Sequence, residues 1–493
     1  MKSKRVKFLS LMVVLALVFT LGFSGIMSGC KAEEAAAPAE EEEAAPAEEE
    51  VAEEAEPAEE EEAEEAAPAE EKTFWQMIQD GDLDFSGIEI NYLYQGGMGY
   101  SDEYIPACAE EFEALTGCKV IVDPTPWEAQ MPKIVNDVTT GANRYDVFEG
   151  DIEFQYGLYA YMEELTPYIE KYNVQMDGYF EPMYTFGEWS GMGRFGLPFS
   201  TGISSILIRT DIFDAAGITY PFDSWEDFYA ALGEVQDPGN GFYGTSFAGV
   251  NAQLVKVWLA RYWGQESALY SKTWQPMVNC PEGVKATELM IDYVNYAPPG
   301  VMGWDLPEAA AAFLNGDTAA YESWYSMVAG DIDNPERSNI LDKWTMIPAP
   351  GGGPTGNFTQ HNVDLFKASE NKDAAFCWMA YVTSEERQMQ NAEDAIAGVQ
   401  RGFDTARKKP FTDVIIPDKP SLTDYVTSLD NGIPMTPGLP QWLEAFMAIG
   451  EHCGMAMTGD ITAEEAVEGL EATLKGIIET SIPPYEYVSP YAK

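Results

Sequence analysis

Positive charge and histidine are scarce in this chain of 493 residues. It has 28 Lys and Arg against 82 Asp and Glu, which gives a formal net charge of −54. That balance argues against binding of nucleic acid or of an anionic membrane surface through a basic face. The chain has only two histidines, His361 and His452, and no CxxC pair, so zinc-site spacing is absent. The sequence therefore predicts no nucleic-acid partner, no metal and no cofactor.

Signatures of common enzyme classes are also missing. There is no GxSxG motif, no P-loop, and no GxGxxG between a strand and a helix. The 62 acidic residues between 73 and 493 single out no carboxylate pair for glycoside hydrolysis, although counting alone does not exclude one. We expect a binding protein and not an enzyme.

The first 30 residues have the pattern of an export signal. A basic head precedes the apolar run Phe8–Met27, and the small residues Ser28 and Gly29 precede Cys30. This ending resembles the processing site of bacterial lipoproteins, in which the cysteine is lipidated and becomes the new N-terminus. We therefore expect a signal peptide over 1–29, lipidation of Cys30, and an extracytoplasmic, membrane-anchored protein. An uncleaved membrane helix is the alternative, since 20 apolar residues can span a bilayer.

Residues 30–72 have the composition of an extended spacer. Residues 31–72 consist almost only of Ala, Glu and Pro, with 20 Glu and 2 Lys. Such a segment buries no apolar surface and repels itself, so we expect it to be disordered and to hold a folded domain away from the membrane.

The remaining cysteines leave two alternatives open. With Cys30 lipidated, an odd number is left, so at most two disulfides can form. Cys108 and Cys118 flank a helix end and could pair, but buried free thiols are equally compatible with the pattern. The five are Cys108, Cys118, Cys280, Cys377 and Cys453.

Strand and helix patterns alternate along the folded part. This alternation predicts an α/β fold with a mostly parallel sheet. Ligands of such sheets lie beyond the carboxyl ends of the strands, which puts Gln95, Trp127 and the stretch Glu149–Asp151 near a candidate site. The expected strands are Ile88–Tyr94, Lys119–Asp123, Tyr145–Phe148, Ser204–Ile208 and Gly241–Phe247. The expected helices are Asp102–Leu115, Glu128–Thr140, Ser224–Leu232, Gln253–Gly264, Asp373–Val382, Trp442–Gly454 and Ala463–Thr480.

Short motifs in a fixed order resemble one family, the family 1 extracellular solute-binding proteins of ABC importers, the group of the maltose-binding protein. The resemblance covers nearly all of residues 87–480. It implies a two-lobed periplasmic-binding-protein-like fold of type II with a ligand cleft between the lobes. Lobe one would comprise 73–195 plus 345–405, and lobe two 196–344 plus 406–493. The motifs are Phe112–Gly117, Tyr145–Val147, Leu197–Asp211, Phe313–Ala320, Pro348–Gly352, Asn371–Ala375 and Ile461–Ala466.

The resemblance implies a monomeric receptor that captures a mono- or oligosaccharide and delivers it to an ABC transporter permease. A non-sugar solute (polyol, organic acid or phosphosugar), or a surface sensor or adhesin with the same fold, is the alternative. Sugars need aromatic planes and planar polar groups. Packing for the tryptophans, a helix N-cap for Asp151 and a structural role for His361 are the competing interpretations. The candidate ligand-binding residues are Gln95, Trp127, Asp151, Phe199, Ser200, Asn251, Trp304, Trp324, His361, Asn362 and Trp442.

Overall fold

The computed structural model describes residues 71–97, 99–186, 193–351, 356–399 and 404–480, together with 482–483, 485–487, 489 and 491. The predicted signal peptide, Cys30 and nearly all of the predicted spacer lie outside the described residues. No helix within these ranges is long and apolar enough to cross a membrane. The five cysteines after Cys30 are free thiols, so neither of the two that flank a helix end is in a disulfide.

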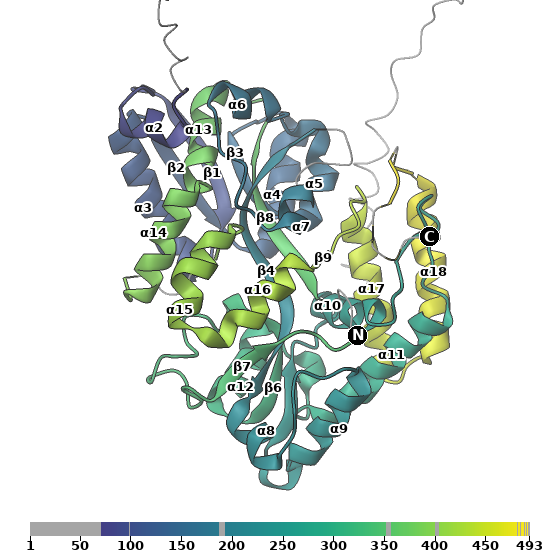
Figure 1. The fold of residues 1–493 in the computed structure, drawn as a ribbon. Coiled ribbons are helices and arrows are strands. Elements are labelled where there is room, and N and C mark those ends of the chain that lie inside the picture. The colour runs from purple at the N-terminus through teal and green to yellow at the C-terminus, as the bar shows by residue number, and fades with distance from the viewer. Residues whose placement is uncertain are drawn as a thin grey trace, which may run out of the picture. The chain divides into compact units, whose positions relative to one another are not determined.

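The first three strands and the two helices between them follow the predicted alternation. They are β1 (Glu89–Gln95), α3 (Gly99–Thr116), β2 (Lys119–Thr125), α4 (Trp127–Thr140) and β3 (Val147–Asp151). The three strands are parallel in the order β2-β1-β3. Side chains alternate along β1: Tyr92 packs in a core with residues of α3, and Leu93 packs in another with residues of α4. Helices therefore cover both faces of this part of the sheet (Figure 1).

The long strand β4 (Gly196–Arg209) joins two parts of the sheet, and all 14 of its residues are buried. Its residues Gly196–Ile203 pair with β8 (Asn357–Leu365), and Ser204–Ile208 pair with β6 (Thr318–Trp324). We call β2, β1, β3, β8 and Gly196–Ile203 the first sheet half. The second sheet half comprises β6, Ser204–Arg209 and the strands β5 (Tyr243–Phe247) and β7 (Trp344–Ile347).

Two predictions about the sheet need correction. The sheet is mixed, because β8 runs antiparallel to β3 and to β4, and β4 runs antiparallel to β6. The predicted first lobe included residues 345–347, but these belong to β7, which pairs with the second part of β4. The pairing partner of β4 changes between Ile203 and Ser204, whereas the sequence placed a boundary before residue 196.

A large apolar core packs against the second sheet half. It includes the buried side chains of Trp225 and Trp258. Trp442 also belongs to this core: it is 0% exposed and packs edge-on against Phe446. Its position in the loop before a helix suggested a ligand platform, but the side chain points into the helix packing. The longer contributing helices are α9 (Trp225–Val235), α10 (Asn251–Trp263), α11 (Pro281–Tyr293), α17 (Trp442–Met457) and α18 (Ala463–Thr480). Helix α12 (Leu306–Asn315) packs into a different core through Ala309 and Phe313.

Shorter elements complete the described chain. Helix α13 follows β8 in the chain and α14 follows α13. Helix α16 lies beside β4 and β7. Their bounds, with those of the other short elements, are α2 (Phe74–Gln79), α5 (Ile152–Leu158), α6 (Thr166–Lys171), α7 (Glu181–Phe186), α8 (Thr210–Ala216), α13 (Lys372–Val382), α14 (Glu385–Ile396), α15 (Ile416–Asp418), α16 (Thr423–Asp430) and β9 (Ile433–Pro434).

One ion pair is completely enclosed in the apolar core that contains Trp225 and Trp258. Arg261 of α10 donates from both terminal nitrogens to Glu322 of β6, at 3.0 and 3.1 Å, and from Nε to the hydroxyl of Tyr229. The two charged side chains are 0% and 2% exposed. The guanidinium also lies over the rings of Trp225 and Tyr293. Such a pair is stable only while both partners are present, because either charge alone would be buried without compensation.

We expect Glu322→Gln to lower the free energy of unfolding by about 3–5 kcal/mol, since it leaves the guanidinium without its counterion. Denaturant unfolding followed by tryptophan fluorescence measures this loss. Glu226→Gln is the matched control, because Glu226 pairs with Lys285 at 2.7 Å on an exposed surface. It should cost less than about 1 kcal/mol. Equal losses in the two variants would contradict the assignment.

Candidate functional site

Asp151 lies where β3 ends and α5 begins, at the carboxyl edge predicted to hold a ligand. It occupies the N-cap position of α5, but its side chain makes no capping hydrogen bond. One carboxylate oxygen accepts from Trp127 Nε1 at 3.2 Å, and the other accepts from the hydroxyl of Thr359. The N-cap interpretation therefore describes the backbone of this residue, while the carboxylate is held by side chains of α4 and β8.

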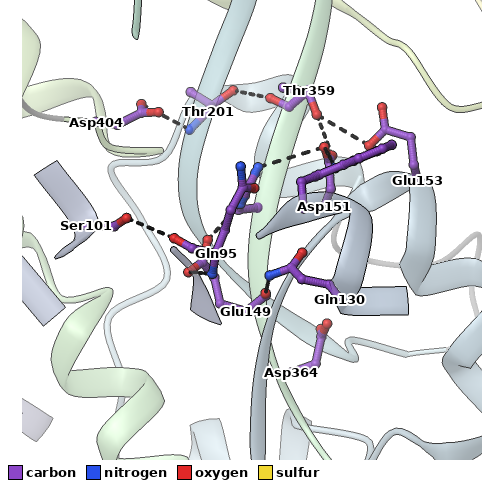
Figure 2. A network of polar contacts seen from close by, with 12 residues as sticks. Gln95, Ser101, Gln130, Glu149, Asp151, Glu153, Thr201, Thr359, Asp364 and Asp404 are labelled. Carbon is purple, nitrogen blue, oxygen red and sulfur yellow. Dashed lines mark hydrogen bonds and ion pairs between the residues drawn. The ribbon is translucent and has the colours of Figure 1, made fainter. Parts of the chain in front are cut away.

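His361 links two carboxylates of β3. The register of β8 against β3 sets His361 opposite Asp151. Its Nδ1 lies 2.7 Å from Glu149 Oε1, and its Nε2 lies 3.8 Å from Asp151 Oδ2. The second oxygen of Glu149 accepts from the backbone N–H of Gln95, at 3.2 Å. Figure 2 shows Gln95, Glu149 and Asp151 close together at the ends of β1 and β3.

Burial and charge act in opposite directions on His361. Its side chain is only 12% exposed, and burial by itself lowers the pKa of the imidazole. The hydrogen bond to Glu149 and the charge of Asp151 outweigh that effect and raise the pKa to about 9. The ring is therefore an imidazolium at neutral pH and donates to Glu149.

Two further carboxyl groups border this region. Burial raises the pKa of Glu153 well above its usual range, and it raises the pKa of Asp404 to about 7. Glu153 lies 3.5 Å from the hydroxyl of Thr359, and Asp404 accepts from the backbone N–H of Thr201 at 3.3 Å (Figure 2). The site thus offers many acceptor oxygens and little positive charge. Among the described residues, no group of three or more His, Cys, Asp or Glu has an arrangement that could hold a metal ion.

Trp324 adjoins this acidic region from the second sheet half. It is the last residue of β6, opposite Ser204, and is partly exposed. A Cβ atom placed on Gly202 would lie 3.5 Å from Trp324 Cε3 and 3.9 Å from Thr359 Cγ2. The indole and the threonine that binds Asp151 therefore both border the space beside Gly202, which has no side chain to fill it.

The structure brings together about half of the predicted site residues. Gln95, Trp127, Asp151 and His361 are in one network, and Ser200 pairs with His361 across the sheet. Trp324 lies next to this network. Trp127 also packs its ring on Phe154, with the ring centroids 5.1 Å apart.

Asn362 lies on the opposite face of β8 from His361, because neighbouring strand residues alternate. There it is fully buried and donates from Nδ2 to Gln155 Oε1 at 2.7 Å, and Gln155 donates in turn to Asp364. Burial raises the pKa of Asp364 well above its usual range. Asn362 therefore belongs to a separate polar network within the first sheet half.

Three other candidates lie away from the network. Phe199 stacks on Tyr104 in the core of the first sheet half. Asn251 is the exposed first residue of α10, and Trp304 is partly buried, with its carbonyl accepting from the backbone N–H groups before α10. Asn251 and Trp304 thus lie close together at the N-terminal end of α10.

Sequence reasoning missed Thr359, Glu153 and Lys256. Alternation in a strand would have placed Thr359 on the same face as His361, two residues later. Lys256 had a stronger signal, since it interrupts the apolar sequence of α10. It is 1% exposed, and its Nζ donates to Ser323 Oγ at 3.0 Å. Burial lowers its pKa to about 7, against the opposing charges of Glu322 and Asp305.

Comparison with known proteins agrees with this architecture. Residues 70–389 match the family of bacterial extracellular solute-binding proteins. The chain belongs to this family. The α/β, two-lobed fold of the type II periplasmic binding proteins is thereby confirmed, as is an extracytoplasmic place of action.

Curated members of the solute-binding family cover much of the chain at low identity. The "Probable amino-acid ABC transporter periplasmic-binding protein y4oP" of Sinorhizobium fredii is 22% identical over 80% of this chain and 90% of its own length. The erythritol/L-threitol-binding protein of Mycolicibacterium smegmatis is 23% identical over 66% of this chain and 74% of its own.

Solved solute-binding proteins share the fold. One from Agrobacterium radiobacter K84, in complex with ribitol, has a TM-score of 0.70 and 19% identity, and covers 80% of this chain and all of its own. The maltose-bound MalE3 protein of T. maritima has a TM-score of 0.69 and 20% identity, over 79% of this chain and all of its own.

We expect His361→Asn to change how stability depends on pH. A folded-state pKa of about 9, above the ordinary value of 6.5, contributes stability that is complete below pH 6.5 and is lost as pH rises through 9. The contribution is on the order of 2–3 kcal/mol. The difference in unfolding free energy between the wild type and the variant should therefore shrink between pH 6 and pH 10.

His452→Asn is the control for this measurement. Its ring lies 2.9 Å from the backbone carbonyl of Ala448 and not from a carboxylate, so this variant should not reproduce the loss expected for His361→Asn. A constant difference between wild type and His361→Asn over the whole pH range would mean that the His361 ring carries no extra proton in the fold.

Proposed function

We propose that the protein captures a carbohydrate or a polyol beyond the carboxyl ends of β1 and β3 and delivers it to an ABC transporter permease. The observation that carries this proposal is the row of groups from Trp127 through Asp151 and Thr359 to Trp324. Two partly exposed indoles at its ends can pack on the C–H faces of a sugar. Carboxylate and hydroxyl oxygens between them can accept hydrogen bonds from a series of hydroxyl groups.

The relatives named above support the same class of ligand. Their names and complexes include erythritol or L-threitol, ribitol and maltose, all of them rich in hydroxyl groups. One relative carries an amino-acid name, so amino acids belong in the test as well. A receptor for neutral hydroxylated solutes agrees with the surplus of acceptor oxygens at the site.

We further propose that the mature protein is anchored by a lipid on Cys30. The basic head, the apolar run Phe8–Met27 and the small residues before Cys30 support processing at that residue. The acidic segment after it would then act as a flexible spacer that lets the receptor reach its permease.

Ligand screening by thermal shift tests the binding proposal, because a solute that binds the native state raises the melting temperature. At least one sugar or polyol should stabilise the protein. Trp324→Ala should weaken its binding about 30-fold or more, since packing of the solute's C–H groups on the indole is lost. Tyr161→Ala is the control: Tyr161 is 40% exposed and hydrogen-bonds through its backbone near Lys367, beyond the other end of β8. Stabilisation by amino acids alone would overturn the carbohydrate assignment.

Mass spectrometry of the protein isolated from membranes tests the anchor. We expect a mature chain that begins at Cys30 and carries acyl groups, and we expect Cys30→Ala to release the protein from the membrane fraction. An intact Met1 on the mature protein would show that the apolar run is retained, and the lipid anchor would then be excluded.

A further inference from the structure

Lys256 places an ionisable amine inside α10. Every residue of this helix from Leu254 to Trp263 is buried. The ammonium donates to Ser323 Oγ and lies 5.0 Å from the centroid of the Trp324 ring. An ammonium has three N–H donors, and in the part of the chain that the structure describes only Ser323 accepts from it. Two donors therefore remain for another partner.

The charges around Lys256 do not balance. Arg261, five residues later on α10, takes both carboxylate oxygens of Glu322. Asp305 acts on Lys256 only as a more distant charge, and it lies at an exposed helix cap. When Lys256 is protonated, two buried cations thus share one buried carboxylate. A buried charge without its own counterion is unfavourable by several kcal/mol, so a methionine at this position would stabilise the core better.

Lys256 adjoins the proposed binding surface and two unpaired acceptors. Its ammonium is close to Trp324, which borders the space beside Gly202 together with Thr359. Asn357 donates from Nδ2 to the carbonyl of Lys256 at 2.9 Å, and its buried Oδ1 has no hydrogen-bond partner. The buried hydroxyl of Ser204, the residue paired with Trp324, likewise has none.

We propose that Lys256 selects a solute with a carboxylate next to its hydroxyl groups, that is, a sugar acid of the aldonate or uronate type. This inference rests on the proposed carbohydrate binding and narrows its ligand class. The carboxylate would accept from the ammonium and supply the missing negative charge. The hydroxyl beside it would donate to an acceptor such as Asn357 Oδ1, and the more distant hydroxyls would donate to Asp151 and its neighbours.

Matched ligand pairs test this assignment by calorimetry on the full chain. The pairs are D-gluconate with D-glucitol, and D-galacturonate with D-galactose, so each acid differs from its neutral partner at one carbon. We expect the acid of at least one pair to bind about 30-fold or more tightly than its partner, which corresponds to about 2 kcal/mol. Lys256→Met should reduce that preference to less than about threefold, and Lys256→Arg should retain most of it.

The melting temperature of the ligand-free variant separates recognition from a structural role. We expect Lys256→Met to melt at the same temperature as the wild type or higher, because it removes an unpaired buried charge. A lower melting temperature would indicate that the lysine serves the fold and would overturn the inference. Lys285→Met, which removes an exposed lysine paired with Glu226, should change neither the preference nor the melting temperature.

The outcomes distinguish this inference from the function on which it rests. Binding of the neutral partners alone, unchanged in Lys256→Met, would overturn the role of Lys256 and leave the carbohydrate receptor standing. Binding of D-glucose 6-phosphate but of neither acid would overturn the carboxylate assignment. Failure of every acid and every neutral partner to bind would overturn both proposals together.

Discussion

The rest of the structure depends on the continuous pairing of β4. One buried strand of 14 residues supplies partners to β8 through its first part and to β6 and β7 through its second. A shift of one residue in either register would turn every side chain of that part toward the opposite face. Both sheet halves, and both ends of the candidate site, are therefore positioned by a single stretch of backbone.

The two sheet halves carry opposite imbalances of buried charge. The first holds Glu149, Asp151 and Asp404 around one imidazolium, His361. The second holds Lys256 and Arg261 with one carboxylate, Glu322. Neither imbalance is favourable for a core, because charges leave water at a cost unless each finds a partner. Trp324, whose ring lies 5.0 Å from the Lys256 ammonium, and Thr359, which binds Asp151, both border Gly202, next to the point where β4 changes its partners.

Much of the fold could be predicted from the sequence because its signals are local. Helix α4 matched the expected range to within a residue, since an amphipathic run ends at Gly141, which has a left-handed φ of 68°. Strand β4 was only half predicted: Pro198 resembles a strand break, and the structure accommodates it at an irregularity between Pro198 and Ser200. The proline is visible in the sequence, whereas the continued pairing on both sides of it depends on the neighbouring strand β8.

Site residues could likewise be predicted where the signal is local and could not where it depends on distant parts of the chain. Asp151 and Trp127 could be found because each follows a strand, and strand ends are visible in sequence. Trp442 could not be separated from them, because a tryptophan before a helix packs inward or outward according to helices distant in the chain. Lys256 interrupts an apolar helix in the sequence, but its lack of a carboxylate of its own becomes visible only in the assembled core.

The position of the site at the change of partners has a physical consequence. Asp151 and Thr359 belong to the first sheet half, and Trp324 belongs to the second, while Gly202 lies on the shared strand and borders both Thr359 and Trp324. Any change in the bend of β4 between Ile203 and Ser204 therefore alters the distance from the indole to the carboxylate. A solute that contacts both favours the bend at which both contacts form, by as much as its affinities for the two bends differ. The strand that holds the fold together is thus also the element through which binding would act on it.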